Sequence, residues 1–172
     1  AFSTAETSVP KGFPKGILKT EVKKATAALG IKADDLFVYN YEARTLNYNR
    51  QGILDKLVQL RDDLNPDLVL MPSLHDIHQD HTTVAVEGLR AFKKTTILGY
   101  ELIWNNLQFN AQCFIRLSQN NVQSKINALK EYGSQSGKDY MSEEFIFSIA
   151  KARGVQIGAK FAECFEVIRW VI

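Results

Sequence analysis

The segment that decides the fold is Asp67-Leu68-Val69-Leu70-Met71-Pro72-Ser73-Leu74-His75-Asp76-Ile77-His78-Gln79-Asp80-His81. Its first part is an apolar run that predicts a buried strand, and its second part holds every histidine of the chain. Residues 82–90 follow with the pattern of a helix. Because α/β enzymes place their chemistry where a strand passes into a helix at the carboxyl edge of the sheet, we expect the functional site here.

Outward from this segment, strand and helix patterns alternate along the whole chain. Helices are predicted over residues 17–29, 50–64, 81–92, about 118–132 and 142–153, with Gly30, Gly133 and Gly154 as their ends, and strands over residues 36–39, 68–71, 96–100, 111–117 and 161–170. Such alternation is typical of βαβ units and a mostly parallel sheet. We therefore predict a single α/β domain over residues 1–172, a three-layer Rossmann-like fold.

The composition excludes several classes of protein. The chain has 172 residues, of which 45% are hydrophobic and 23% charged, and its net charge of +2 gives no basis for nucleic-acid binding. No apolar run approaches the roughly 20 residues that span a bilayer. Cys113 and Cys164 each lie in an apolar run, so we expect small buried side chains in a reducing compartment and a cytoplasmic location.

The histidine spacing points to metal chemistry. Neutral imidazole suits zinc, and zinc in a hydrolase takes three protein ligands and a water that becomes the nucleophile. His75, His78 and His81 are spaced by three residues, but Pro72 makes the first of them part of a loop, so the three need not bind one ion. Asp76 and Asp80 are both able to accept a hydrogen bond from an imidazole and orient it. Alternatively, the histidines are solvated and Asp80 is a helix N-cap.

The motif His78-Gln79-Asp80-His81, after an apolar strand that ends in proline, resembles the second motif of the LmbE/PIG-L family of zinc-dependent de-N-acetylases. That motif reads roughly His-Pro-Asp-His and is often preceded by an aspartate, as by Asp76 here. Further similarity to a bacterial subgroup of the family lies in residues 6–10, the region of Arg44 and Arg50, and residues 66–70, 99–101 and 161–166. The resemblance therefore covers nearly the whole chain.

The resemblance implies a function and a set of roles. His81 is expected to be a zinc ligand, His78 the imidazole that stabilises or protonates the tetrahedral intermediate, and Asp80 a partner that orients a histidine. The implied activity is zinc-dependent removal of an N-acetyl group from an amino sugar or sugar conjugate.

The first motif of the family, approximately His-Pro-Asp-Asp-Glu, is absent from the sequence. The pairs Asp34-Asp35 and Asp62-Asp63 have no histidine before them, and residues 1–3 have the pattern of a strand end. We therefore expect a domain that lacks its first strand and helix, and a chain that by itself is poor in metal and inactive, since catalytic zinc uses three ligands. The alternative is a non-catalytic carbohydrate- or partner-binding relative; a phosphoesterase is disfavoured because a two-metal site needs more ligands.

Three residues outside the motif are candidates for binding the substrate. Arg44 is favoured over Arg50, because an arginine in a loop after a strand is able to clamp hydroxyls or phosphates. Glu6 follows the first strand end, and Trp104, next to two asparagines, suits a sugar. For each, a salt bridge or packing is the alternative. We expect an N-acetylated sugar as substrate, and an exposed strand edge that favours homo-oligomers.

Overall fold

The computed structural model describes residues 1–172, which form two compact units. The first, here called the helical unit, contains Ala1–Ala43 and Ile115–Glu163; the second, here called the histidine unit, contains Arg44–Phe114 and Cys164–Ile172. Each unit thus combines two separate stretches of the chain. The histidine stretch, residues 75–81, lies wholly within the histidine unit. A single domain over residues 1–172 stays a prediction.

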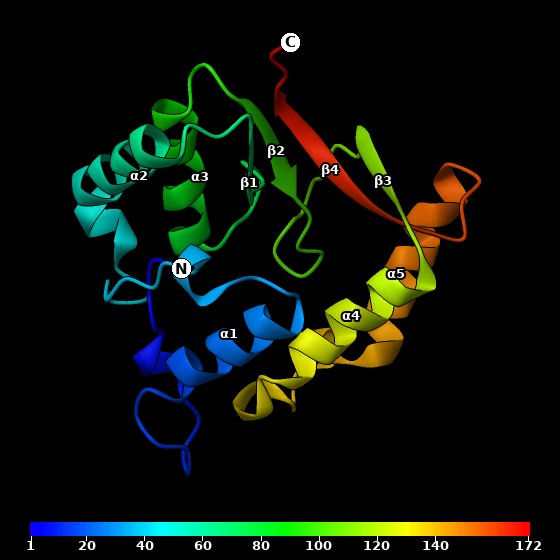
Figure 1. Ribbon diagram of the computed structural model, residues 1–172, viewed down its shortest axis with the longest axis horizontal. Helices are drawn as coiled ribbons and strands as arrows, with labels where there is room; N and C mark the ends of the chain where they lie inside the picture. The colour runs from blue at the N-terminus through cyan, green and yellow to red at the C-terminus, as the bar shows by residue number, and fades with distance from the viewer. The chain divides into compact units, whose positions relative to one another are not determined.

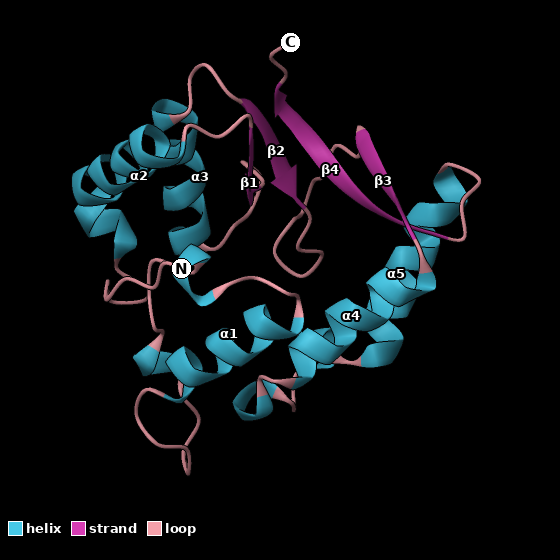
Figure 2. Cartoon of the chain, viewed as in Figure 1, coloured by secondary structure: helices cyan, strands magenta, loops and turns pink.

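Five helices and four strands alternate through much of the chain (Figure 1). The helices are α1 Ile17–Ala28, α2 Arg50–Leu64, α3 Gln79–Ala91, α4 Gln119–Lys130 and α5 Glu143–Gln156, and the strands are β1 Leu68–Pro72, β2 Thr96–Tyr100, β3 Cys113–Leu117 and β4 Phe161–Arg169 (Figure 2). The α/β class predicted from the sequence is confirmed.

The strands form one mixed sheet in the order β1-β2-β4-β3. Strand β1 runs parallel to β2, with Leu68 opposite Thr96 and Pro72 opposite Tyr100. Strand β4 runs antiparallel to β2. The parallel pair places the carboxyl ends of β1 and β2 at the same edge, which is where the histidine stretch begins.

Helix α3 packs on strand β1. Helices α2 and α3 lie side by side next to the strands of the histidine unit (Figure 1), and α3 contacts β1. A Cβ atom on Gly88 of α3 would lie 2.7 Å from the sulfur of Met71 in β1. The absent side chain leaves room for the Met71 side chain between the last turn of α3 and β1.

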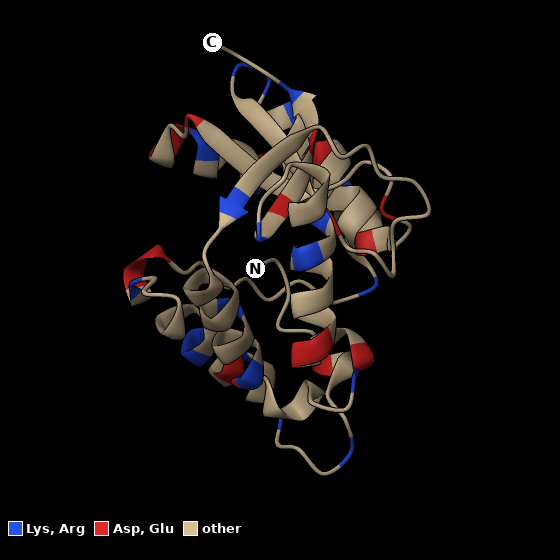
Figure 3. Cartoon of the chain, turned by 90° about the vertical axis from the view of Figure 1, so that its right-hand side faces the viewer, with Lys and Arg blue, Asp and Glu red and all other residues tan.

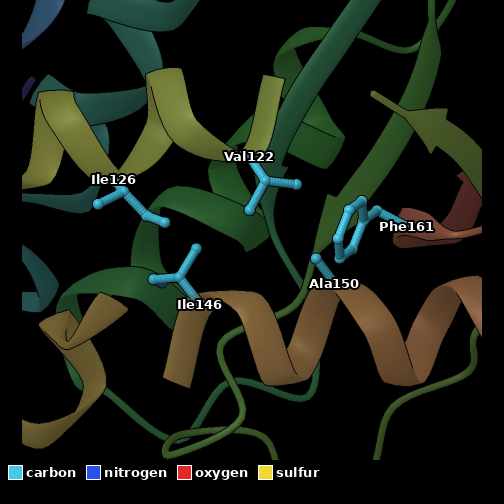
Figure 4. Packing of buried hydrophobic residues seen from close by; sticks show 5 residues of the cluster. All are labelled: Val122, Ile126, Ile146, Ala150 and Phe161. Carbon is cyan, nitrogen blue, oxygen red and sulfur yellow. The ribbon is translucent and has the colours of Figure 1, made fainter. Parts of the chain in front are cut away.

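The helical unit has a core of its own between α4 and α5. Figure 4 shows its buried side chains, which come from both helices and the start of β4: Val122, Ile126, Ile146, Ala150 and Phe161. The amino end of α4 is fixed by a capping box in which Ser118 and Asn121 bond each other's backbone N–H groups. Ser118 is therefore the N-cap of α4, at the predicted start of this helix.

Two local predictions are wrong. Residues 36–39 are extended but form no strand of the sheet, because the nearby backbone hydrogen-bonds the start of the chain instead: the N–H of Tyr39 donates to the Ala1 carbonyl at 2.8 Å. Gly154 does not end α5, which continues to Gln156. A Cβ atom on Gly154 would lie 2.7 Å from the Ala159 carbonyl, so this glycine serves close packing rather than termination.

The prediction of buried cysteines is confirmed for Cys164 and only in part for Cys113. Charged segments of both signs lie on the helices (Figure 3). No helix has the length and apolar content to cross a membrane. Both cysteines are free thiols, with Cys164 buried and Cys113 partly buried.

Candidate active site

The amino end of α3 brings His78 and Asp80 to the end of β1. The helix begins at Gln79, two residues earlier than predicted, with His78 as its N-cap. The Nδ1 atom of His78 accepts the backbone N–H of Asp80 at 3.2 Å. The alternative that Asp80 is the N-cap is therefore wrong: an imidazole nitrogen satisfies the free N–H group of the first turn.

Asp76 orients His81. Its Oδ2 lies 2.8 Å from Nδ1 of His81, and its Oδ1 accepts the backbone N–H of His78 at 2.8 Å. The Asp76 side chain is only 1% exposed, so both contacts are made away from water. Because a carboxylate accepts and does not donate, the network assigns the proton to Nδ1 of His81 and leaves the lone pair of Nε2 free.

The two imidazoles of His78 and His81 are stacked, with ring centroids 4.5 Å apart and an angle of 28° between their planes. Nδ1 of His78 is an acceptor, so its neutral ring carries the proton on Nε2. The neighbouring rings therefore have opposite tautomers. One presents a hydrogen-bond donor at Nε2, and the other presents a lone pair at the same position.

Asp80 holds a loop rather than a histidine. Its carboxylate accepts the backbone N–H of Arg44 at 2.5 Å and that of Leu46 at 3.2 Å. Arg44 has a φ of +71°, a conformation that a side chain disfavours. The prediction that Asp80 orients a histidine is thus corrected: Asp76 does so for His81, and Asp80 anchors the loop that carries Arg44.

The other substrate candidates have different settings. Arg50 is committed to the buried carboxylate of Glu87, with its Nε 2.7 Å from Oε1, so the salt-bridge alternative holds for Arg50. Arg44 is exposed, as expected for a substrate contact. Glu6 lies in a one-turn helix of the helical unit, where it accepts the N–H of Gly16 at 3.0 Å.

The loop after β2 borders the histidine stretch. The Asn105 carbonyl accepts the N–H of Ile77 at 3.2 Å, and the Asn105 amide lies 3.4 Å from Nδ1 of His81. Trp104 is the preceding residue and is 43% exposed. The loop singled out for its Trp104 therefore reaches the site through Asn105, a residue whose contact the sequence did not reveal.

Tyr100 is the last residue of β2 and lies near enough to Asp76 to feel its charge. Burial, and secondly the nearby charge of Asp76, raise the pKa of Tyr100 to about 12. The phenol therefore stays neutral beside Asp76 at physiological pH.

Of the two aspartates able to orient a histidine, the sequence did not single out Asp76, and it did not assign Glu166 at all. The signal for Asp76 was its place between two histidines. The signal for Glu166 was a carboxylate inside an apolar strand, where it is 7% exposed and lies 3.3 Å from His75.

The side chains near His81 do not provide the three ligands of a catalytic zinc ion. No group of three or more His, Cys, Asp or Glu side chains is arranged to hold a metal ion. His81, with Asp76 behind it, has the form of one zinc ligand and its hydrogen-bonded partner. Since catalytic zinc uses three ligands, these 172 residues do not complete such a site.

Comparison with protein families gave one match. The family model described as PIG-L, GlcNAc-PI de-N-acetylase, matches residues 8–92. This segment includes Arg44 and the whole histidine stretch. A search of the curated proteins found no match.

Solved structures share the fold. N,N'-diacetylchitobiose deacetylase from Pyrococcus horikoshii is 20% identical, with a TM-score of 0.76 over 97% of this chain and 70% of that one. The zinc-inhibited form of teicoplanin deacetylase Orf2 is 17% identical, with a TM-score of 0.65 over 90% and 74%. GalB, a 4-carboxy-2-hydroxymuconate hydratase from Pseudomonas putida KT2440, is 16% identical, with a TM-score of 0.75 over 100% and 83%. A hydratase and two deacetylases on one fold show that the reaction has to be argued from the site.

Proposed function

The chain belongs to the PIG-L family, and from that premise we propose that it takes part in removing the acetyl group from an N-acetylated amino sugar or sugar conjugate. The observation that carries the proposal is the stacked pair of His78 and His81, in which Nδ1 of His78 faces a backbone N–H and Nδ1 of His81 faces a carboxylate. Hydrolysis of an amide needs a proton donor for the leaving amine and a group that holds the attacking water, and the pair offers one ring for each task.

His78 is the proposed acid. In the reaction, water adds to the amide carbonyl, the C–N bond breaks, and the products are acetate and a free amine. The Nε2–H of His78 donates a hydrogen bond to the oxyanion, and the proton that the water gives up on attack is delivered to the departing nitrogen. The hydrogen bond from the Asp80 backbone to Nδ1 favours the tautomer that offers the Nε2–H to the oxyanion.

His81 is the proposed metal ligand, and zinc is the proposed metal. When bound by three ligands, zinc lowers the pKa of its water to about 7. Asp76 would fix His81 for this role, as carboxylates do for zinc-bound histidines. Two further ligands are not found among these residues, so we propose that they come from outside the 172 residues and that this chain alone is inactive.

Arg44 and Trp104 are the proposed contacts to the sugar. Both are exposed in loops of the histidine unit that the site residues hold: Asp80 bonds the backbone of Arg44, and Asn105, beside Trp104, reaches His81. Glu6 stays a proposed substrate contact on the resemblance alone. The two free thiols favour a cytoplasmic location, and β1 at the edge of the sheet, with Leu68 and Leu70 exposed, favours self-association.

The test is acetate release from N-acetylglucosamine conjugates by protein made from the full-length gene. Removing the proton donor in His78→Ala is expected to lower kcat by roughly 10²- to 10⁴-fold. Gln79→Ala, at the exposed neighbouring position, is the matched control and is expected to keep wild-type kcat. Wild-type rates in His78→Ala, or no acetate release by the full-length protein with zinc, would contradict the proposal.

A non-catalytic carbohydrate-binding relative is the second candidate. The absence of any three-ligand group in the chain favours it. Sugar binding by the full-length protein, without acetate release at any metal loading, would select this candidate.

A further inference from the structure

A second carboxylate–imidazole pair lies beside the first. Glu166 of β4 is 7% exposed, and its Oε1 lies 3.3 Å from Nε2 of His75. Its other oxygen, Oε2, accepts the hydroxyl of Ser73 at 2.7 Å. Ser73 is fully buried and also accepts the backbone N–H of His75 at 3.1 Å. The ring and the backbone of His75 are thus held by one buried cluster.

Three strand segments are shaped to admit this carboxylate. Ser73 follows β1, Gly99 is in β2 and Glu166 is in β4. A Cβ atom on Gly99 would lie 3.0 Å from Cα of Ser73 and 3.3 Å from Oε2 of Glu166. Both distances are too short to leave the cluster undisturbed, so the space at Gly99 lets the serine and the carboxylate meet.

The burial of Glu166 needs an explanation beyond stability. A buried carboxylate is expensive to desolvate, and an apolar side chain of similar size is often equally stable or more stable at such a position. What an apolar side chain would not do is hold an imidazole. The outward effect of the cluster is the fixed orientation of His75, whose side chain is 42% exposed.

The orientation determines which atom of His75 is offered to a ligand. Nε2 lies 3.3 Å from Oε1 of Glu166, and a carboxylate this close favours the neutral tautomer with its proton on Nε2. Nδ1 has no hydrogen-bond partner within the protein. It is a neutral acceptor, and a hydroxyl group is the substrate donor that fits it, whereas an anion has no proton to give.

We propose that His75 binds a hydroxyl group of the sugar through Nδ1, and that Glu166 and Ser73 are positioning residues for it. This inference rests on the proposed function, because a hydroxyl-rich ligand is its substrate class. His75 precedes the acid His78 by three residues, so a sugar bound at Nδ1 is held next to the reacting pair. No covalent step involves His75.

The test separates binding from chemistry in full-length protein. His75→Phe keeps a ring but has no acceptor, and Glu166→Gln weakens the hold on the imidazole. A neutral hydrogen bond contributes about 1 kcal/mol, so each variant is expected to raise KM by roughly 3- to 10-fold with kcat changed less than twofold. Leu74→Ala, at an exposed neighbouring position, is the control and is expected to leave KM unchanged.

Deoxy analogues of N-acetylglucosamine provide the decisive arm. With the wild type, one analogue is expected to have a KM that is raised by the same factor of roughly 3- to 10-fold. With His75→Phe, the same analogue and the parent sugar should have equal KM values, because the variant already lacks the hydrogen bond that the analogue cannot form. In the wild type, ¹⁵N NMR is expected to show the His75 proton on Nε2, with this preference reduced in Glu166→Gln. A purely structural role would lower thermal stability without these changes.

The outcomes distinguish the two proposals. If the full-length protein releases acetate, but every analogue raises KM by the same factor in the wild type and in His75→Phe, the hydroxyl contact is overturned. The proposed function then still stands. Without acetate release, N-acetylglucosamine is titrated and followed by NMR. Binding that weakens in His75→Phe then supports the contact while the proposed function fails, and binding that is equal in both proteins overturns the contact as well.

Discussion

The chemistry offered by each histidine follows from the ring nitrogen that the protein occupies. His78 has Nδ1 filled by a backbone donor, His81 has Nδ1 filled by a carboxylate, and His75 has Nε2 filled by another carboxylate. Three side chains of one type therefore present three different faces. Residue type and spacing identify the stretch as a candidate site, but they do not determine which ring nitrogen of each histidine is left for a ligand.

Asp80 and Arg44 are expected to be energetically coupled. Asp80→Ala leaves two backbone N–H groups without their partner and is expected to destabilise the protein by about 1–3 kcal/mol. Arg44→Gly relieves a positive φ, so in that background the loss from Asp80→Ala should be smaller by about 1 kcal/mol. Urea unfolding of the four proteins measures the coupling, and hydrogen exchange at the Leu46 amide locates it. Strictly additive losses would contradict this role of Asp80.

Tyr100 is expected to make the protein sensitive to alkali. Its pKa is about 12 in the folded state, against 10 for an ordinary tyrosine, so the folded state holds this proton more tightly. The stability that the neutral phenol contributes is complete below pH 10 and is lost as the pH rises from 10 to 12. Between these values the wild type should therefore lose about 2 kcal/mol relative to Tyr100→Phe, as measured by urea unfolding across this pH range. Parallel pH profiles for the two proteins would exclude the effect.

At the scale of elements, locally encoded features are predicted well and long-range ones are not. The bounds of α2 match residue for residue, and Ser142 begins α5 as predicted, because caps and helical spacing are local. The direction of β4 has no local signal, since an antiparallel strand has the same apolar pattern as a parallel one. The partners of Asp80 have no local signal for a similar reason. They are backbone N–H groups of a loop that lies 34 to 36 residues away in the sequence.

Gly154 tests the difference between a stop signal and close packing. If it merely ended a helix, alanine there would be tolerated or stabilising. Because a Cβ atom would meet the backbone of Ala159 and Lys160 at 2.7 to 2.9 Å, Gly154→Ala is expected to destabilise the protein by about 1–3 kcal/mol. Gly137→Ala, where the new Cβ atom has no neighbour within 4 Å, is the control. Equal midpoints in thermal unfolding for both variants would refute the packing role.

At the scale of the whole molecule, the chain contains some of the side chains that a zinc-dependent deacetylase needs. The histidine unit holds the proposed acid, the proposed ligand and both carboxylates that orient histidines, Asp76 and Glu166. It therefore contains one proposed ligand, but not the two further ligands that a catalytic zinc site needs.

The zinc content of the protein tests whether these 172 residues provide a complete metal site. One oriented imidazole is too few for a tight site, so the 172-residue chain is expected to retain far less than one equivalent of zinc after dialysis, and His81→Ala is expected to remove the weak remainder. Protein from the full-length gene should retain one equivalent and should also lose it in His81→Ala. Metal content by atomic spectroscopy gives both values, with Asp35→Ala, an exposed carboxylate of the helical unit, as control. One tightly held equivalent in the 172-residue chain would show that its own side chains rearrange into a complete site, and the proposal of outside ligands would then be wrong.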